Sequence, residues 1–362
     1  MAVIHRKRHK GVIATDPTKA ARSAGLSYTS DQSPGYRRQR RGQRFSYIAS
    51  DGRLLQNQEE IRRIKALVIP PAWEEVWICQ NPNGHLQATG RDARGRKQYR
   101  YHARWRTVRD EAKYASLSEF AERLPLIRKQ VRKDMRLPDL PKRKVLATLV
   151  QLLETTLIRV GNEEYARHNG SFGLTTLRNR HASVTGEELR FEFKGKGGKN
   201  HSISLRDRRL AQIVKKCQEL PGRELFQYID ENGERQSVDS GDVNEYLREV
   251  AKEGFTAKDY RTWAGSVLAA VALRNLGSFK SRAEANRNIL RAVETVASKL
   301  GNTRSICRKC YVHPAVINAY LDGTLDSAGR SPLAESVGLR PEETALIGLL
   351  RRRLIVESRK AS

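Results

Sequence analysis

Acidic residues are too few in this chain to balance the basic ones. The 362 residues include 68 Lys and Arg against 40 Asp and Glu, which leaves a formal charge of +28. Such an excess would repel itself in a compact protein unless a polyanion screened it. Nucleic acid is the expected partner, because neutralising its phosphates releases counterions and favours binding. An anionic membrane surface is the rival polyanion.

Long hydrophobic runs are also missing. No stretch of about 18 apolar residues occurs, the length that indicates a membrane-spanning helix, and no basic amphipathic helix stands apart as an anchor. The basic N-terminus, Met1 to Lys10, lacks the apolar segment of an export signal. We therefore expect a cytoplasmic, nucleoid-associated protein with no membrane partner.

Cysteine is scarce as well. The chain has 4 cysteines, too few for a disulfide framework at this length, and a reducing compartment fits. Cys307 and Cys310 form a C-x-x-C pair near His313, but no second C-x-x-C pair supplies further zinc ligands. We expect no metal site and interpret both cysteines as ordinary helix residues.

Two cofactor signatures are absent. No G-x-x-x-x-G-K-[ST] loop is present to hold a nucleotide. No acidic cluster indicates an obligatory Mg²⁺ site. The sequence therefore predicts a protein that works without a cofactor or a nucleotide.

Local composition divides the chain into four expected segments, and its length suffices for two or three domains. Residues 1–25 are predicted to be a basic flexible tail, and 26–105 a mainly β N-terminal domain. Residues 106–325 are predicted to form a mostly helical domain, to which the family resemblance described below assigns catalysis, and 326–362 a C-terminal extension with a basic helix. The expected fold class is α+β.

Short apolar runs between turn residues predict strands in the first domain. Val76–Cys79 and Leu86–Thr89 are predicted strands, joined through Asn81–Gly84. The basic run Arg37–Arg41 is predicted to lie in a loop that contacts phosphate, with a solvated turn as the alternative.

Helical periodicity dominates the second domain. Apolar residues recur at helical spacing over 146–157 and over 289–300. Alternating apolar residues over 189–205, interrupted by the turn Gly195–Gly198, predict a β-hairpin. Pro341 is expected to open a last helix, which ends in a basic run.

The segment Gly90–Tyr101 alternates basic residues with aromatic ones. In a strand, Arg96, Gln98 and Arg100 would share one face, and both tyrosines the other. Arginine binds phosphate or guanine, and glutamine pairs with adenine. The alternative is a strand with an exposed polar face and two buried tyrosines. The candidate DNA contacts are Arg91, Arg96, Gln98, Tyr99 and Tyr101.

Several segments, taken in order, resemble the type IB DNA topoisomerases of the compact poxvirus-like and bacterial kind. The order and spacing of the motifs are more specific than any one of them, and the resemblance covers about residues 25–325. The segments that carry it are Ile69–Trp73, Val76–Ile78, Gly90–Tyr101, Ile158–Asn162, Phe193–Lys196, Lys258–Thr262 and Ser305–Tyr311.

This resemblance implies an enzyme that relaxes supercoiled duplex DNA without ATP, acting as a monomer. Its catalytic domain would have the fold shared by tyrosine recombinases and type IB topoisomerases. Tyr311 would form a 3′-phosphotyrosyl intermediate, while Arg159 and Arg261 clamp the phosphate. Lys196 would protonate the departing 5′ oxygen, with Lys258 as an auxiliary in the same relay.

These residue types suit attack on a phosphodiester. The diester is anionic, so charge that builds on its non-bridging oxygens must be neutralised and the leaving oxygen must be protonated. Guanidinium groups bind phosphoryl oxygens with planar forks. Nearby cations also favour the phenolate of a tyrosine, whose ordinary pKa is about 10. Sequence alone does not separate Lys196 from its neighbours Lys194 and Lys199.

Asn302 departs from the family pattern. The family commonly has histidine nine residues before the tyrosine, where this chain has Asn302. An amide does not titrate near neutrality. Asn302 is therefore expected to act by donating a hydrogen bond to a phosphate oxygen.

Two alternatives stay open. A tyrosine recombinase uses related chemistry, but recombinases usually carry histidine at the position of Lys258 and a helical N-terminal domain. In a non-catalytic DNA-binding protein, Tyr311 would be one helix tyrosine among 12, and Arg159 would cap a helix C-terminus.

Overall fold

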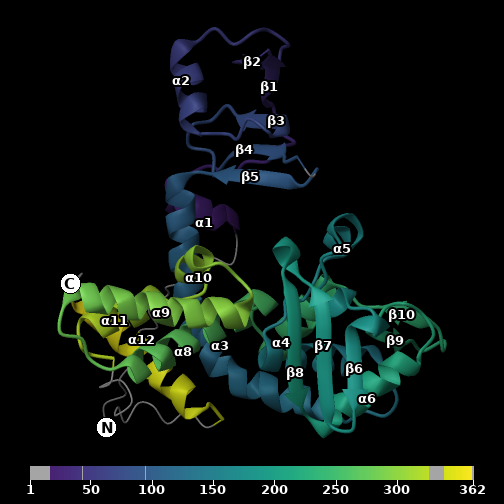
Figure 1. Cartoon of the computed structure of the whole chain (residues 1–362). Coiled ribbons are helices and arrows are strands. Elements are labelled where there is room, and N and C mark those ends of the chain that lie inside the picture. Colours follow the sequence, from purple (N-terminus) through teal and green to yellow (C-terminus); the bar gives the residue numbers. More distant parts are fainter. Residues whose placement is uncertain (1–16, 43, 94, 326–337, 361–362) are drawn as a thin grey trace, which may run out of the picture. The chain divides into compact units, whose positions relative to one another are not determined.

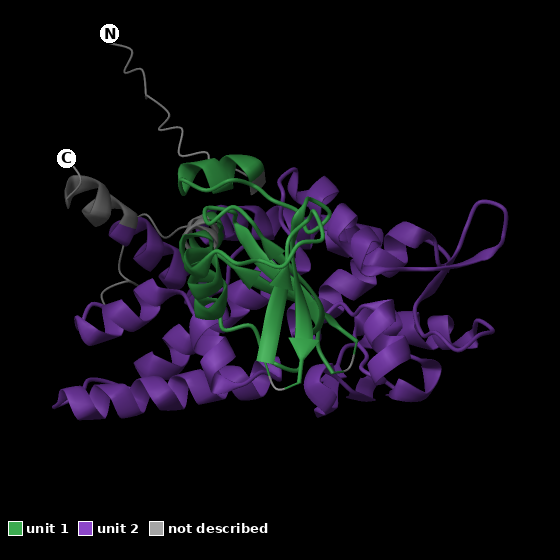
Figure 2. Ribbon diagram, turned by 90° about the horizontal axis from the view of Figure 1, so that it is seen from above, with its two compact units in different colours: residues 1–116 green, residues 117–362 purple. Residues whose placement is uncertain are grey.

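The chain forms two compact units in the computed structural model, which describes residues 17–42, 44–93, 95–325 and 338–360. The units are Met1–Ser116 and Leu117–Ser362 (Figure 2). Their boundary lies inside helix α3, Ala103–Asp134. In the described part of the chain, no helix has both the length and the apolar character that crossing a membrane requires.

The first unit is built on a five-stranded antiparallel sheet with the strand order β2-β1-β3-β4-β5 (Figure 1). The two strands predicted over 76–79 and 86–89 are confirmed as β3 and β4. The elements of this unit that precede α3 are α1 Pro17–Ser23, β1 Gly35–Arg41, β2 Arg44–Ile48, α2 Gln58–Ala66, β3 Glu74–Cys79, β4 Leu86–Arg91 and β5 Lys97–Tyr101.

A small hydrophobic core lies between one face of this sheet and α2. Ile64 from α2 packs with Ile78 and Ala88 from the sheet. The other face carries Arg37 and Trp77, which are paired across β1 and β3. This alternation follows from the period of two in a strand, which turns successive side chains to opposite faces.

The prediction of a loop at Arg37–Arg41 is wrong, because this run forms β1. Arg38 points to the core face, where its guanidinium carbon lies 4.2 Å from the ring centroid of Phe45. It also donates hydrogen bonds to main-chain carbonyls, including that of Pro70 at 3.0 Å. These partners let a basic residue occupy an inward-facing strand position.

The expected flexible tail also contains a helix. Pro17–Ser23 forms α1, because Ala21 packs with Leu26 and Trp105 in a separate small cluster. Residues 1–16 of that tail lie outside the described residues.

The second unit is mostly helical. Besides the end of α3, its described helices are α4 Lys142–Thr156, α5 Glu163–Asn169, α6 Arg208–Glu219, α7 Ser240–Ala251, α8 Ala257–Leu276, α9 Arg282–Leu300, α10 Arg304–Cys310, α11 Pro314–Leu321 and α12 Pro341–Lys360, with short 3-10 turns at Leu174–Thr176, Asn179–His181 and Lys196–Gly198. The helices predicted over 146–157, 289–300 and from Pro341 are confirmed as α4, α9 and α12.

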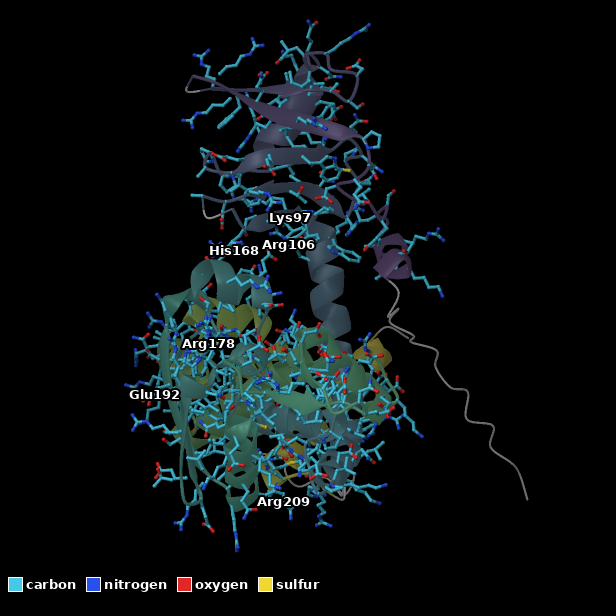
Figure 3. All side chains as sticks on the ribbon, turned by 90° about the vertical axis from the view of Figure 1, so that its right-hand side faces the viewer. Lys97, Arg106, His168, Arg178, Glu192 and Arg209 are labelled. Atoms are coloured by element: carbon cyan, nitrogen blue, oxygen red, sulfur yellow. The ribbon has the colours of Figure 1, made fainter. Side chains whose placement is uncertain are left out.

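Two small sheets complete this unit. The strands are β6 Ala182–Thr185, β7 Glu188–Lys194 and β8 Asn200–Arg206, in that order in one sheet, and β9 Gln227–Ile229 and β10 Arg235–Ser237 in the other. The predicted hairpin is confirmed as β7 and β8. Along β7, Leu189, Phe191 and Phe193 are buried, while Glu192 is exposed at the surface (Figure 3). Helix α6 packs against this sheet (Figure 1).

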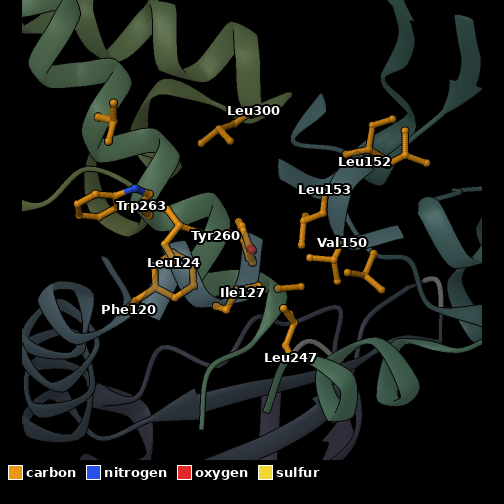
Figure 4. Close-up of a cluster of buried hydrophobic side chains, with 14 of the residues drawn as sticks. Phe120, Leu124, Ile127, Val150, Leu152, Leu153, Leu247, Tyr260, Trp263 and Leu300 are labelled. Atoms are coloured by element: carbon orange, nitrogen blue, oxygen red, sulfur yellow. The ribbon is translucent and has the colours of Figure 1, made fainter. Parts of the chain in front are cut away.

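One large core joins the helices of the second unit. Phe120 and Leu124 from α3, Leu153 from α4, Leu247 from α7 and Tyr260 from α8 are all buried in it (Figure 4). Burying side chains of this size stabilises the unit by roughly 1.5–3 kcal/mol each. The core therefore fixes α4 and α8, and the candidate catalytic residues lie on or next to α4, α8, α9, α10 and the turn between β7 and β8.

Candidate active site

The second unit gathers three of the predicted catalytic residues around one small pocket. Arg159, Lys196 and Arg261 line it together. Asn302 and Tyr311 adjoin this group through direct contacts with the two arginines. These five residues come from distant parts of the sequence.

Arg159 follows the end of α4. The helix ends at Leu157, which has a left-handed backbone with φ 57° and turns the chain away. The guanidinium of Arg159 donates a hydrogen bond to Oδ1 of Asn302. Burial lowers the pKa of Arg159 from its usual value, although an arginine remains charged in neutral solution.

Arg261 lies in the second turn of α8 and is only 4% exposed. Its guanidinium donates to the main-chain carbonyls of Leu157 and Leu300, the second at 2.7 Å. Burial, and then the like charge of Arg159, lower the pKa of Arg261 to about 10. Its Nε is buried without a hydrogen-bond partner among the described residues. Carbonyl oxygens at the C-terminal ends of α4 and α9 thus hold the Arg261 guanidinium in place and leave its Nε–H without a partner in the described part of the chain.

Tyr311 stands at the C-terminal end of α10. Its N–H donates to the carbonyl of Cys307 at 2.9 Å, and the guanidinium carbon of Arg261 lies 5.4 Å from its ring centroid. Gly265 lets α8 pack closely against the main chain of Tyr311. A Cβ at this position would lie only 2.5 Å from the Tyr311 carbonyl oxygen. Ser266 donates to the same oxygen at 3.3 Å. Helix α8 therefore positions both Arg261 and the tyrosine.

Asn302 lies in the turn between α9 and α10 and is 9% exposed. Gly301, with φ 61°, ends α9 just before it. The side-chain Oδ1 accepts from Arg159, while Nδ2 is buried without a hydrogen-bond partner in the described part of the chain. The role of this amide as a donor to a phosphate oxygen stays a prediction.

Lys196 is exposed on the turn that joins β7 and β8. Both Gly197 and Gly198 have φ 77° in this turn, a backbone conformation that residues other than glycine rarely adopt. The structure also separates the neighbouring lysines: Lys199 Nζ donates to the main-chain oxygen of Asn302 at 3.0 Å, whereas Lys196 lines the pocket.

Lys258 is exposed in the first turn of α8. Its auxiliary role stays a prediction.

His201 is a pocket residue that the sequence analysis missed. It lines the pocket with Lys196, and its ring stacks on Phe193. Burial, and then the charges of Arg159 and Arg261, lower its pKa. The signal for it was the alternation along β8, where His201 precedes Ile203 and Leu205 on the inward face.

Cys307 and Cys310 of α10 are not linked to each other by a disulfide. Cys307 is buried, which raises its pKa, and Cys310 is partly exposed. Over the described ranges of the chain, no group of three or more His, Cys, Asp or Glu side chains is placed to hold a metal ion.

The predicted DNA contacts lie in the first unit. Tyr99 is 47% exposed and stacks on Tyr101, with ring centroids 6.0 Å apart. The two tyrosines share a face, as predicted, but Tyr99 is not buried as the alternative required. Arg91 pairs with Glu75 at 2.8 Å.

Arg96 and Gln98 both contact one carboxylate. Arg96 forms an ion pair with Asp92 at 2.6 Å, and the Gln98 amide donates to the same carboxylate at 3.0 Å. Arg96 lies just before β5, and Gln98 within it. Binding DNA through these two side chains would require them to exchange this partner for a phosphate or a base.

Comparison with known proteins gives two family matches. Residues 102–327 match the family described as "Eukaryotic DNA topoisomerase I, catalytic core". Residues 44–92 match "Bacterial DNA topoisomerase IB, N-terminal domain".

Curated viral proteins are similar over most of the chain. DNA topoisomerase 1B of Acanthamoeba polyphaga mimivirus is 33% identical over 295 residues, which is 79% of this chain and 87% of the viral protein. DNA topoisomerase 1B of Vaccinia virus (strain Copenhagen) and DNA topoisomerase I of Monkeypox virus are each 22% identical over 261 residues, 71% of this chain and 77% of theirs.

Proposed function

This chain belongs to the type IB DNA topoisomerase family, and we propose that Tyr311 is the nucleophile of its reaction. The enzyme relaxes supercoiled DNA by a tyrosine-linked transesterification. The observation that supports Tyr311 is its position beside the buried guanidinium of Arg261, 5.4 Å from the ring centroid. A cation there can neutralise the negative charge that develops when the phenol oxygen attacks phosphorus.

In the proposed cleavage step, the Tyr311 oxygen bonds to phosphorus and the bond from phosphorus to the 5′ oxygen breaks. The phenol proton passes to solvent, and the protein becomes joined to the 3′ phosphate. Arg159 and Arg261 neutralise charge on the non-bridging oxygens. Arg261 Nε and Asn302 Nδ2, which are buried without partners in the described part of the chain, supply further donors to these oxygens.

Lys196 supplies the proton that the departing 5′ oxygen needs. Its ammonium is exposed on a glycine-rich turn at the edge of the pocket, from which it can reach a bound strand. Lys258 is proposed as an auxiliary to the same proton transfer. The freed strand then rotates about its intact partner.

Religation reverses these steps. The 5′ hydroxyl attacks the phosphotyrosine, loses its proton to Lys196 and expels Tyr311. Because the phosphotyrosine conserves the energy of the broken bond, no nucleotide is consumed.

The first unit is proposed to bind duplex DNA. The exposed stacked ring of Tyr99 and the basic side chain of Arg91 lie on the sheet face opposite the α2 core. Tyr101 shares the face of Tyr99, whereas Gln98 alternates to the other face of β5. Arg96 and Gln98 complete the proposed set of DNA contacts. We further propose that the enzyme acts as a monomer in the cytoplasm, bound to the nucleoid.

A tyrosine recombinase is disfavoured by the first unit. Its five-stranded sheet differs from the helical N-terminal domain expected of a recombinase, and part of it matches a topoisomerase N-terminal domain.

The test is relaxation of positively and negatively supercoiled circles in EDTA without ATP. Wild-type protein should relax both and leave a detergent-resistant protein–DNA adduct, and Tyr311→Phe should do neither. Tyr165→Phe is the matched control, because Tyr165 is an exposed tyrosine of the same unit at 39%. An adduct that persists in Tyr311→Phe would assign the nucleophile elsewhere.

A further inference from the structure

His201 lies in the catalytic pocket but has no part in the steps above. Its ring is parallel to that of Phe193, with centroids 5.0 Å apart and an interplanar angle of 10°. It lines the pocket that Arg159, Lys196 and Arg261 also line. His201 belongs to β8, the strand that follows the Lys196 turn. Its contacts indicate what the ring does there.

Two glycines enclose the edge of this ring. A Cβ on Gly195 would lie 2.6 Å from Cδ2 and Nε2 of His201, and a Cβ on Gly301 would lie 2.4 Å from Cε1. Contacts this short do not occur between real side chains, so only glycine leaves room for the ring. Gly195 directly precedes Lys196, and Gly301 directly precedes Asn302. The imidazole is therefore wedged between the backbones that lead into two proposed catalytic residues.

A second contact joins the same two segments. Lys199 Nζ donates to the main-chain oxygen of Asn302 at 3.0 Å. The turn that carries Lys196 is thus tied to the α9–α10 junction on its C-terminal side by both Lys199 and His201. The turn itself contains two glycines with positive φ, and glycine carries the largest backbone freedom to be lost on ordering.

We propose that His201 is a positioning residue that holds the Lys196 turn against Gly301 and thereby sets the reach of the Lys196 ammonium to the leaving 5′ oxygen. This inference rests on the proposed role of Lys196 as proton donor. The ring acts by its shape: burial and the cations around it lower the pKa of His201, which disfavours a further cation in the site.

The experiment changes one atom of the substrate. Single-turnover cleavage is measured on two duplexes whose scissile linkage carries either the normal 5′ oxygen or a bridging 5′ sulfur. A thiolate leaves without being protonated, so the sulfur duplex does not need a proton donor. His201→Ala should slow the oxygen duplex by about 10- to 100-fold, the cost of misplacing a catalytic group, and leave the sulfur duplex within about threefold of wild type. Lys196→Ala should show the same pattern.

Glycine variants test the wedge without altering His201. In Gly301→Ala the new methyl group would displace the ring, so it should slow the oxygen duplex selectively, as His201→Ala does. Gly170→Ala is the matched control. Gly170 ends α5 with φ 55° and ψ 32°, close to φ 61° and ψ 38° at Gly301, but nothing lies within 4 Å of its added Cβ. It therefore carries the same backbone strain and should cleave both duplexes like wild type.

Equal slowing of both duplexes by His201→Ala would overturn the proposal, because it would indicate contact with the phosphate or a disturbed fold. Unchanged cleavage of both would overturn it as well. Should Lys196→Ala slow both duplexes equally, the proton-donor assignment fails, and this inference with it. The assignment of Tyr311 is tested separately by the adduct assay, so the two failures are distinguishable.

Discussion

Arg159 and Arg261, the two proposed phosphate ligands, have partners that leave their positive charge in place. Each guanidinium is held by neutral oxygens, the amide of Asn302 in one case and two main-chain carbonyls in the other. Carboxylate partners would have cancelled the positive charge before DNA arrived. The depressed pKa of Arg261, caused by burial and then by Arg159, shows that two like charges are kept close at some cost to stability.

Asn302 offers the most direct residue-level prediction. Asn302→Ala should slow single-turnover cleavage by about 10²- to 10³-fold, the usual effect of removing one donor to a developing anion. Asn302→His should retain most of the rate, since an imidazole N–H can donate to the same oxygen. Near-wild-type cleavage by both variants would contradict the donor role.

His181 predicts how stability depends on pH. It is 8% exposed, and its Nδ1 accepts a hydrogen bond from the Arg178 N–H at 3.1 Å. Burial, and then Arg180 and Arg178, lower its pKa below 6.5. The unfolded state therefore binds more protons, and the free energy of unfolding should fall as the pH drops through about 6.5.

Urea unfolding between about pH 7.5 and about pH 5.5 measures this slope. His181→Gln should flatten it. His168→Gln should not, because His168 is exposed. An unchanged slope in His181→Gln would show that other groups cause the loss.

At this scale, the types and order of the candidate catalytic residues could be predicted, because family motifs preserve them along the chain. His201 could not be. Its role depends on the packing of Gly301, a residue far along the chain, and no local pattern reports such a contact. The contact is between His201 on β8 and Gly301 at the end of α9. These two elements come together only when the chain folds.

Among the elements, α8 carries Arg261 and also packs against Tyr311, the proposed nucleophile, through Gly265. Gly265→Ala should favour the helix itself by up to about 1 kcal/mol. Its Cβ, however, would lie 2.5 Å from the Tyr311 carbonyl oxygen, so the tyrosine must shift and cleavage should fall by about 100-fold. Single-turnover cleavage and thermal melting measure the two effects.

Gly241→Ala is the matched control for that variant. Gly241 is also helical, but the atom nearest to its added Cβ is Asp239 Oδ1 at 3.0 Å, a less severe approach than the 2.5 Å at Gly265. It should leave cleavage unchanged. A comparable loss in both variants would indicate a general effect of the added methyl group.

Helix α12 is attached to the second unit by a buried ion pair. Glu343, with its side chain 5% exposed, lies 2.7 Å from the guanidinium of Arg128, which also contacts Glu154. Glu343→Gln should lower the free energy of unfolding by about 3 kcal/mol, because a buried cation loses a charged partner. Glu192→Gln removes the exposed pair with Arg190 and should cost less than about 1 kcal/mol. Denaturant unfolding compares the two, and equal losses would contradict the buried role.

Periodic elements were predictable from sequence because their apolar residues repeat with the helix or strand period. This holds for α4, α9 and the β7–β8 hairpin. Strand β1 was not predictable from sequence, because basic residues occupy both its inward-facing and its outward-facing positions. The apolar–polar alternation that indicates a strand is therefore absent. Only the contacts of Arg38 with Phe45 and with main-chain carbonyls reveal that one arginine points inward.

For the whole molecule, the charge of +28 predicts binding that depends steeply on salt. The logarithm of the DNA association constant should fall linearly with the logarithm of salt concentration, by about 0.9 for each phosphate neutralised. Equilibrium binding of Tyr311→Phe measures this without cleavage. Adding Arg91→Ala should reduce the slope by about one, whereas Arg206→Ala, which removes an arginine 83% exposed beside Glu187, should not. A slope unaffected by Arg91→Ala would remove that residue from the DNA surface.

The division into a sheet-bearing first unit and a mostly helical second unit was also predictable, since turn-rich strands give way to helical periodicity near residue 105. The boundary at Ser116 was not. Helix α3 runs through it without a break, so no change of pattern marks the place where the contacts separate.

None of the described residues lining the catalytic pocket is acidic, which has a practical consequence. An inorganic sulfate or phosphate ion presents the same tetrahedron of oxygens as the linkage in a nucleic acid strand. Such an ion should therefore bind to the guanidinium groups of Arg159 and Arg261 and compete with DNA for them. The anion of the buffer is therefore a variable in every rate measured on this enzyme, apart from its contribution to ionic strength.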